Sequence, residues 1–262
     1  MRKHTNLLWK DINLSVSIDY PASYFANTYQ KSPAIIICHG FIGSKVGVNR
    51  LFVKACEELK KIGYVVVRFD YAGCGESEGH YGKNTLRGFI EQTKEVLNFV
   101  KSLDKIDSNQ LTLIGHSLGG AIATICSVNE ENVKRLILWS AVGNPYKDIQ
   151  IIMSRETTNI HDYYGYTFHT EFFESLKEAN PIKLCSFFKG DVLIIHGDAD
   201  EDIPVQYAAL YEKDFLSRSL GTCNRFTISE ADHTFSRSDS FKKLIGITKD
   251  WLLDGYLQKK TM

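Results

Sequence analysis

The feature that most constrains the fold is a regular alternation of short apolar runs with longer segments of helical spacing. Runs rich in β-branched residues predict strands at 34–38, 64–69, 111–114, 135–139, 192–195 and 226–229. Helical spacing covers 50–61, 86–102, 118–128, 205–215 and 238–253. This order predicts an α/β fold with one mostly parallel central sheet and helices on both of its faces. Residues 13–19 alternate in polarity and predict an antiparallel edge strand.

One segment interrupts the alternation. From about 143 to 189 no run resembles a sheet strand, and aromatic residues gather in DYYGYTFHTEFF, residues 162–173. Structureless loops of this length are uncommon in compact domains, so we expect a small folded insertion, or cap. No repeat or linker-like tract divides the chain, which predicts a single domain over 1–262 that carries the cap.

Charge and hydropathy limit the classes of partner. The 31 lysines and arginines match the 31 acidic residues, so no net field favours nucleic acid or an anionic membrane. The first apolar residues end at Lys10 and Asp11, too early for a signal peptide, and no run approaches a membrane span. We therefore expect a cytoplasmic protein that acts on a small molecule and has no nucleic-acid or membrane partner. The sequence leaves a homodimer open.

Cysteine, histidine and glycine patterns predict neither a metal nor a bound cofactor. The six cysteines lack a C-x-x-C pair and any zinc-ligand spacing, and we expect buried, reduced thiols. His161 and His169 have no fixed element between them that would hold both against one metal ion. The segment GCGESEG at 73–79 lacks the spacing of a dinucleotide-binding loop.

The segment GHSLG at 115–119 places Ser117 between a predicted strand and a predicted helix, the context that the G-x-S-x-G nucleophile motif requires. Residues beside so sharp a turn are crowded, and glycine has no Cβ to collide with neighbouring backbone. The following helix would direct its first amides and its positive dipole end at the site. A tight turn that contains a serine by chance is the alternative, and the strand and helix around it favour a nucleophile.

A serine nucleophile needs a base, and the base needs an acid that orients it. His233 follows the last predicted strand and precedes the final helix, where a parallel sheet delivers loop residues to its carboxyl edge. The segment DADED at 198–202 follows the preceding strand. We assign the acid to Asp200 because it lies far enough from the strand end to reach the histidine, and the two neighbouring aspartates remain alternatives. The resulting chain order is Ser117, Asp200, His233.

Attack by the serine creates a tetrahedral oxyanion, which preorganised amides must hold. The amide of Leu118, directly after the serine, is one candidate. The amide of Phe41, behind His39 and Gly40 in the turn after strand 34–38, is the other.

The aromatic residues of the cap have two interpretations that the sequence leaves open. They either line a pocket for an acyl or aromatic group, or they form the core of the cap itself. The candidate pocket residues are Tyr163, Tyr164, Tyr166, Phe168 and Phe172, with Phe173 beside them.

With these motifs in this order, the sequence resembles the α/β-hydrolase family over essentially its whole length, and most of all bacterial cinnamoyl or feruloyl esterases and small carboxylesterases. The motifs that carry the resemblance are HGFIGSK at 39–45, RFDYAGCGESEG at 68–79, GHSLGG at 115–120, HGDADEDIP at 196–204 and ADHTF at 231–235. The resemblance implies a cofactor-free serine esterase that cleaves small acyl or hydroxycinnamoyl-like esters through an acyl-enzyme. It implies triad roles for Ser117, Asp200 and His233 and oxyanion roles for the Phe41 and Leu118 amides.

Two other activities would share this sequence pattern. A thioesterase or amidase would use the same triad, and a ligand-binding protein on the same scaffold would keep the pocket and lose the chemistry. Feruloyl esterases of this kind often carry glutamine where Leu118 stands, which favours a plain acyl esterase over a hydroxycinnamate-specific one.

Overall fold

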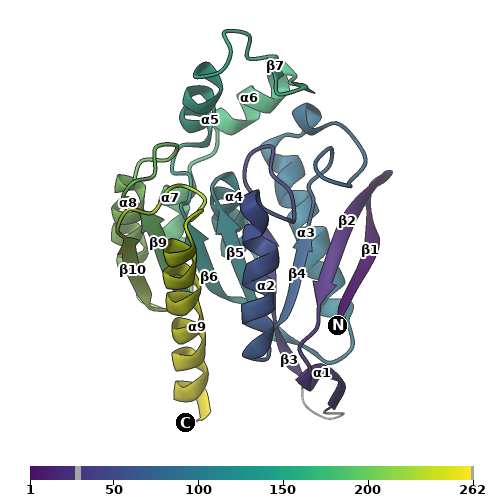
Figure 1. Cartoon of the computed structure of the whole chain (residues 1–262), viewed down its shortest axis with the longest axis vertical. Coiled ribbons are helices and arrows are strands. Elements are labelled where there is room, and N and C mark those ends of the chain that lie inside the picture. Colours follow the sequence, from purple (N-terminus) through teal and green to yellow (C-terminus); the bar gives the residue numbers. More distant parts are fainter. Residues whose placement is uncertain (27–30, 261–262) are drawn as a thin grey trace.

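The structure, a computed structural model, describes residues 1–26 and 31–260, with side chains to residue 254. In this part of the chain, eight strands form one sheet in the order β1-β2-β4-β3-β5-β6-β9-β10 (Figure 1). In the described sheet, the pairs β1–β2 and β2–β4 are antiparallel and the other pairs are parallel, so the predicted mostly parallel arrangement is confirmed. The strands are β1 (Arg2–Trp9), β2 (Ile12–Asp19), β3 (Ser32–Cys38), β4 (Val65–Phe69), β5 (Ile106–His116), β6 (Val133–Trp139), β9 (Asp191–Gly197) and β10 (Cys223–Ile228).

The N-terminal edge of the sheet differs from the prediction. Residues 13–19 fall in β2, which pairs antiparallel with β4 as expected, but β1 pairs with its other side and forms the edge. Leu14 and Val16 are fully buried, as in an interior strand. The sequence gives little sign of β1 because its residues stay exposed or half-exposed along their length, so no buried face marks it.

Helices cover both faces of the sheet (Figure 1). Neighbouring β3 residues point to opposite faces: Ile36 packs in the apolar core that includes α3 and α4, and Ile35 in the core that includes α2 and α9. None of the helices in the described ranges has both the length and the apolar character that crossing a bilayer requires. The helices outside the cap are α1 (Ser23–Ala26), α2 (Leu51–Lys61), α3 (Leu86–Ser102), α4 (Leu118–Val128), α8 (Gln206–Leu216) and α9 (Ser238–Lys260), with 3₁₀ turns η1 (Val48–Arg50) and η2 (Tyr81–Lys83).

The predicted cap lies between β6 and β9, a stretch described in full, in which no residue joins the central sheet. Asparagine caps start two of its helices: the Asn144 side chain accepts from the amide of Lys147, and that of Asn180 from the amide of Lys183. Figure 1 shows α5, α6 and β7 standing over one edge of the sheet, while α7 packs back against α4. The elements are α5 (Pro145–Ser154), β7 (Asp162–Tyr163), β8 (Tyr166–Thr167), α6 (Thr170–Lys177), α7 (Pro181–Leu184) and η3 (Cys185–Phe187).

Candidate active site

Ser117 occupies a strained turn at the carboxyl end of β5. Its backbone has φ 57° and ψ −127°, a conformation that residues other than glycine rarely adopt and that the surroundings must hold in place. The Ser117 amide donates to the carbonyl of Trp139 in β6, and the Ser117 carbonyl accepts from the amide of Val142, both at 3.1 Å. The predicted succession of strand, turn and helix around this serine is confirmed.

Gly115 and Gly119 let this turn pack against neighbouring backbone, as predicted. A Cβ at Gly115 would lie 2.4 Å from the carbonyl oxygen of Gly119. A Cβ at Gly119 would lie 2.2 Å from the carbonyl oxygen of Cys38, at the end of β3. The turn therefore rests directly on the strand that leads into the loop carrying Phe41.

Asp200 and His233 meet in the loops after β9 and β10. His233 Nδ1 lies 2.8 Å from Asp200 Oδ2, and the Asp200 side chain is fully buried. The other carboxylate oxygen accepts the amides of Asp202 and Ile203 at 3.0 and 2.9 Å. Burial would raise the pKa of Asp200, but hydrogen bonds from His196 and His233 hold that pKa well below its ordinary value. The carboxylate is therefore ionised at neutral pH.

The two neighbouring aspartates make other contacts. Asp198 accepts the amide of Glu230 at 2.6 Å. Asp202 pairs with Arg155 at 2.7 Å on the surface. The geometry thus separates Asp200 from the alternatives that the sequence leaves open.

His233 is tied to the nucleophile turn through the residue before the serine. His116 Nε2 donates to the carbonyl of His233 at 2.9 Å, and the two rings lie 4.8 Å apart. Because His233 Nδ1 faces Asp200, Nε2 is the ring nitrogen left to receive a proton. Within the described residues no hydrogen bond joins this ring to Ser117 Oγ. Such bonds are often long in unliganded enzymes and tighten when substrate binds.

The two candidate oxyanion amides flank Ser117. The loop after β3 touches the turn, since a Cβ at Gly40 would lie 2.8 Å from Ser117 Cβ. Leu118 is the first residue of α4, where amides have no partner within the helix. Among the residues that the structure describes, neither Phe41 nor Leu118 donates its amide to a protein acceptor. Both amides therefore lack a competing protein acceptor, and their role in binding an oxyanion stays a prediction.

The ring of Phe41 joins the oxyanion side of the site to the cap. Its centroid lies 5.9 Å from that of Tyr163, 5.5 Å from that of Phe168 and 6.1 Å from that of Phe172. The three cap rings are buried, and Tyr81 packs against Phe41 as well. We call these five residues the aromatic cluster. Their mutual contacts favour the core interpretation for the three cap residues, and pocket lining stays a prediction.

The other two candidate pocket residues lie at the edge of the aromatic cluster: the ring of Tyr164 is 4.6 Å from that of Tyr163, and the ring of Tyr166 is 5.7 Å from that of Tyr81. Tyr164 is 67% exposed. Tyr166 is half-buried and lines a cavity of about 450 Å³ together with His80, Lys83 and His169.

In the described residues, the sequence candidates for metal or disulfide chemistry form neither a disulfide nor a group of metal ligands. The cysteines, all within the described ranges, are free, and burial raises the pKa of Cys38 to about 12. His161 Nδ1 donates to the carbonyl of Phe168 at 2.7 Å. In the described part of the chain, no three histidine, cysteine, aspartate or glutamate side chains gather as a metal site would require.

Comparison with known proteins identifies the fold. A family model for the alpha/beta hydrolase fold matches residues 33–157. The structure of Est1E from Butyrivibrio proteoclasticus with bound ferulic acid matches with a TM-score of 0.83, over 95% of this chain and 98% of that one. The chain has the α/β-hydrolase fold. At 23% identity, the likeness to Est1E shows the α/β-hydrolase fold alone.

Two curated proteins illustrate the range of the chain's relatives. The lysophosphatidylserine lipase ABHD12 of Danio rerio is 31% identical over 215 residues, 76% of this chain. The human mitochondrial palmitoyl-protein thioesterase ABHD10 is 31% identical over 134 residues, 51% of this chain. The chain spans 52% and 37% of the lengths of these two relatives.

Two histidines that sequence analysis did not assign support the α/β-hydrolase site. His196 is the second-to-last residue of β9, is buried, and places Nε2 3.0 Å from Asp200 Oδ2 and 3.1 Å from the carbonyl of Ile203. Burial, with nearby His233 adding to it, lowers the pKa of His116 to about 3, so this ring stays neutral while it holds the His233 carbonyl. The only signal in the sequence was that each histidine lies at or next to a strand end, and the partner it meets depends on the order of strands in the sheet.

Proposed function

We propose that this chain is a serine hydrolase that cleaves carboxylic esters of small acyl or aromatic acids. The observation that carries the proposal is the 2.8 Å contact between His233 Nδ1 and buried Asp200, formed beside the strained turn of Ser117. A base oriented by a buried carboxylate is the arrangement that activates a serine hydroxyl for attack.

In the acylation half of the reaction, Ser117 Oγ attacks the carbonyl carbon of the ester while His233 Nε2 takes the hydroxyl proton. The negative charge moves to the carbonyl oxygen, where the Phe41 and Leu118 amides would stabilise it. The tetrahedral intermediate then breaks the ester C–O bond, and His233 returns the proton to the departing alcohol. Ionised Asp200 stabilises the imidazolium between these two transfers.

The deacylation half repeats these steps with water. His233 Nε2 takes a proton from a water molecule that attacks the acyl-serine carbonyl. Collapse of the second tetrahedral intermediate releases the carboxylic acid, and Ser117 Oγ recovers its proton from His233.

If the aromatic cluster also lines the substrate pocket, which stays a prediction, it would favour an aromatic or short acyl group as substrate. The bound ferulic acid of the structurally similar Est1E supports a hydroxycinnamoyl ester in particular. A thioester is the second candidate, favoured by the similarity to the palmitoyl-protein thioesterase ABHD10. The triad chemistry is the same for both, so acyl and leaving groups must be separated by assay.

Replacing Ser117 with alanine removes the nucleophile, and we expect kcat to fall by about 10⁵- to 10⁶-fold with the fold intact. The measurement is hydrolysis of p-nitrophenyl esters of increasing acyl length, methyl ferulate and an acyl-CoA. A fluorophosphonate probe should label the wild type and fail to label Ser117→Ala. The exposed Ser154→Ala is the matched control and should be labelled like the wild type. A wild-type protein that hydrolyses none of these substrates and takes no label overturns the proposal.

A further inference from the structure

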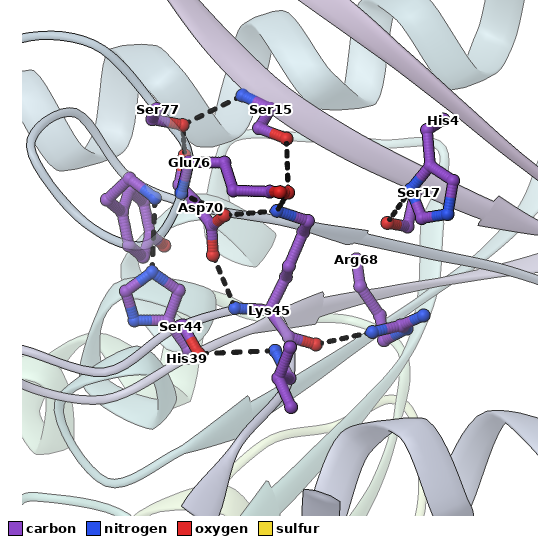
Figure 2. Close-up of polar contacts among 12 residues, drawn as sticks. His4, Ser15, Ser17, His39, Ser44, Lys45, Arg68, Asp70, Glu76 and Ser77 are labelled. Carbon is purple, nitrogen blue, oxygen red and sulfur yellow. Dashed lines mark hydrogen bonds and ion pairs between the residues drawn. The ribbon is translucent and has the colours of Figure 1, made fainter.

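Lys45 is a buried lysine at the end of the oxyanion loop, defined here as residues 39–45. Its side chain is 5% exposed, and Figure 2 shows its ammonium between the carboxylates of Asp70 and Glu76. The contact with Glu76 is 2.6 Å, and Asp70 is fully buried. A buried ion pair often stabilises a fold no better than apolar residues of similar volume. The pair therefore calls for an explanation other than stability.

Three groups of Lys45 are held at once. The ammonium contacts Asp70, and the backbone amide donates to Asp70 Oδ1 at 2.5 Å. The backbone carbonyl accepts from Arg68 Nη1 at 2.7 Å (Figure 2). Arg68 lies in β4, Asp70 follows β4 directly, and both are buried. Lys45 is thus attached to the central sheet.

Asp70, which holds Lys45, is itself linked by hydrogen bonds to a second strand, β2. Asp70 Oδ2 accepts the amide of Glu76 at 3.0 Å, and the Asp70 carbonyl accepts from Ser77 Oγ at 2.6 Å. Ser77 Oγ in turn accepts the amide of Ser15 in β2 at 2.8 Å. The carboxylate that holds Lys45 is therefore fixed from several directions.

Phe41 lies in the oxyanion loop between two fixed ends. At the start of the loop, His39 Nε2 accepts the amide of Tyr71 at 3.1 Å, and at its end Lys45 is held as above. Ile42 has φ 44°, a strained value for a β-branched residue. Such a residue keeps its conformation only where its surroundings enforce it. The Phe41 amide shares its peptide plane with the Gly40 carbonyl, which accepts the amide of Gly43 at 3.1 Å. The turn that sets the direction of the Phe41 amide therefore lies between the two anchored ends of the loop.

We propose that Lys45 and Asp70 are positioning residues that set the Phe41 amide for the oxyanion. They act through the oxyanion loop and leave contact with the reacting atoms to the amide itself. This proposal rests on the proposed function, because the amide needs an oxyanion to stabilise.

The decisive variant changes both charges together, as Lys45→Met with Asp70→Asn. Lys45→Met alone would leave the buried Asp70 carboxylate without its ammonium partner and endanger the fold, whereas the double change leaves a neutral pair of similar size. We expect the double variant to fold, as circular dichroism and thermal unfolding would show. Its kcat should fall about 10- to 100-fold, less than the loss of about 10²- to 10³-fold on removing an oxyanion donor altogether, while KM stays nearly constant.

A trifluoromethyl ketone inhibitor separates oxyanion binding from general damage. Its hemiketal with Ser117 carries the negative charge of the intermediate, so its affinity should fall by the same factor as kcat/KM. The carboxylic acid product, which forms no hemiketal, should bind as it does to the wild type. Lys61→Met removes an exposed lysine paired with Glu58 at 2.6 Å and is the matched control, which should leave rate and both affinities unchanged.

Each outcome decides between the two proposals. A double variant with wild-type kcat and ketone affinity overturns the positioning role and leaves the Ser117 chemistry standing. A double variant that does not fold, or that loses product binding as strongly as ketone binding, assigns the pair to stability and also overturns it. A wild type without hydrolysis or probe labelling overturns the proposed function, and the positioning role with it.

Discussion

Around Ser117 the site is held by backbone conformation and hydrogen bonds, whereas the cap above it is held by packed rings. Ser117 combines φ 57° with a 3.1 Å bond to Trp139. In the cap, Phe172 is fully buried, with its ring 4.9 Å from that of Phe168 and 6.1 Å from that of Phe41. The hydrogen bonds and backbone conformation at Ser117 fix the direction of individual groups, whereas the packed rings fill the interior of the cap.

This difference separates chemistry from stability within one site. Hydrogen bonds orient groups but add modest net free energy, because the unfolded chain bonds to water instead. Burial of apolar surface adds free energy without direction. Substitutions in the triad should therefore change the rate and spare the fold, and substitutions in the aromatic cluster should do the reverse.

Asp200→Asn tests whether the hydrogen-bonded groups around Ser117 control the rate. An amide cannot stabilise a charged imidazole and can offer its own N–H to His233 Nδ1, which favours the wrong tautomer. We expect kcat to fall about 10⁴-fold with the fold intact, measured by steady-state hydrolysis of the best ester. Asp202→Asn, which removes only the surface pair with Arg155, is the control and should change kcat by no more than about twofold. A greater loss in Asp202→Asn than in Asp200→Asn would refute the assignment of the acid.

Phe172→Ala tests whether the packed rings of the cap control stability. Deleting a fully buried ring leaves a cavity, and we expect the free energy of unfolding to fall by about 3–5 kcal/mol in denaturant titrations. Tyr164→Ala, at a side chain that is 67% exposed, is the control, with a change of about 0.5 kcal/mol or less. If Phe172→Ala abolished turnover and left stability intact, this ring would belong to the substrate pocket and the core interpretation would fail.

Acid should lower the free energy of unfolding through the buried histidines near Ser117. Burial lowers the pKa of His116 to about 3 and also lowers the pKa of His39. Histidine in the unfolded chain takes up a proton below about pH 6.5, whereas these buried rings do not, so the free energy of unfolding falls as the pH drops from there toward 3. The lowered pKa of Asp200 adds a further loss only below about pH 4.

His116→Asn should make this acid dependence shallower. Removing one titrating group reduces the slope of unfolding free energy between about pH 6 and 4 by about 1 kcal/mol per pH unit, and His39 accounts for a remaining slope. Denaturant titrations at several pH values provide the measurement. A slope equal to that of the wild type would mean that His116 takes up its proton in the folded state.

The parallel strands and the serine turn could be located from sequence because their signals are local. An apolar run such as 34–38 needs both faces covered wherever it lies, and the spacing of Gly115 and Gly119 follows from crowding within one turn. β1 escaped prediction because a half-exposed edge strand has no buried face to mark it. The local composition of residues 162–173 likewise showed that the cap contains many rings, without showing what they pack against.

The choice among neighbouring aspartates required the folded chain. Asp200 and His233 are 33 residues apart, and His116 and His233 are 117 apart. Asp200 meets His233 because β9 lies next to β10, and the loop after β10 reaches past the ends of β9 and β6 to His116, an order of strands that no short stretch of residues encodes. The amino-acid pattern therefore located the serine turn and predicted its nucleophile, because both depend on adjacent residues. The choice of Asp200, the contact between His116 and His233 and the position of the Phe41 ring could be read only from the arrangement of the whole sheet. Each requires strand ends from distant parts of the chain to lie side by side.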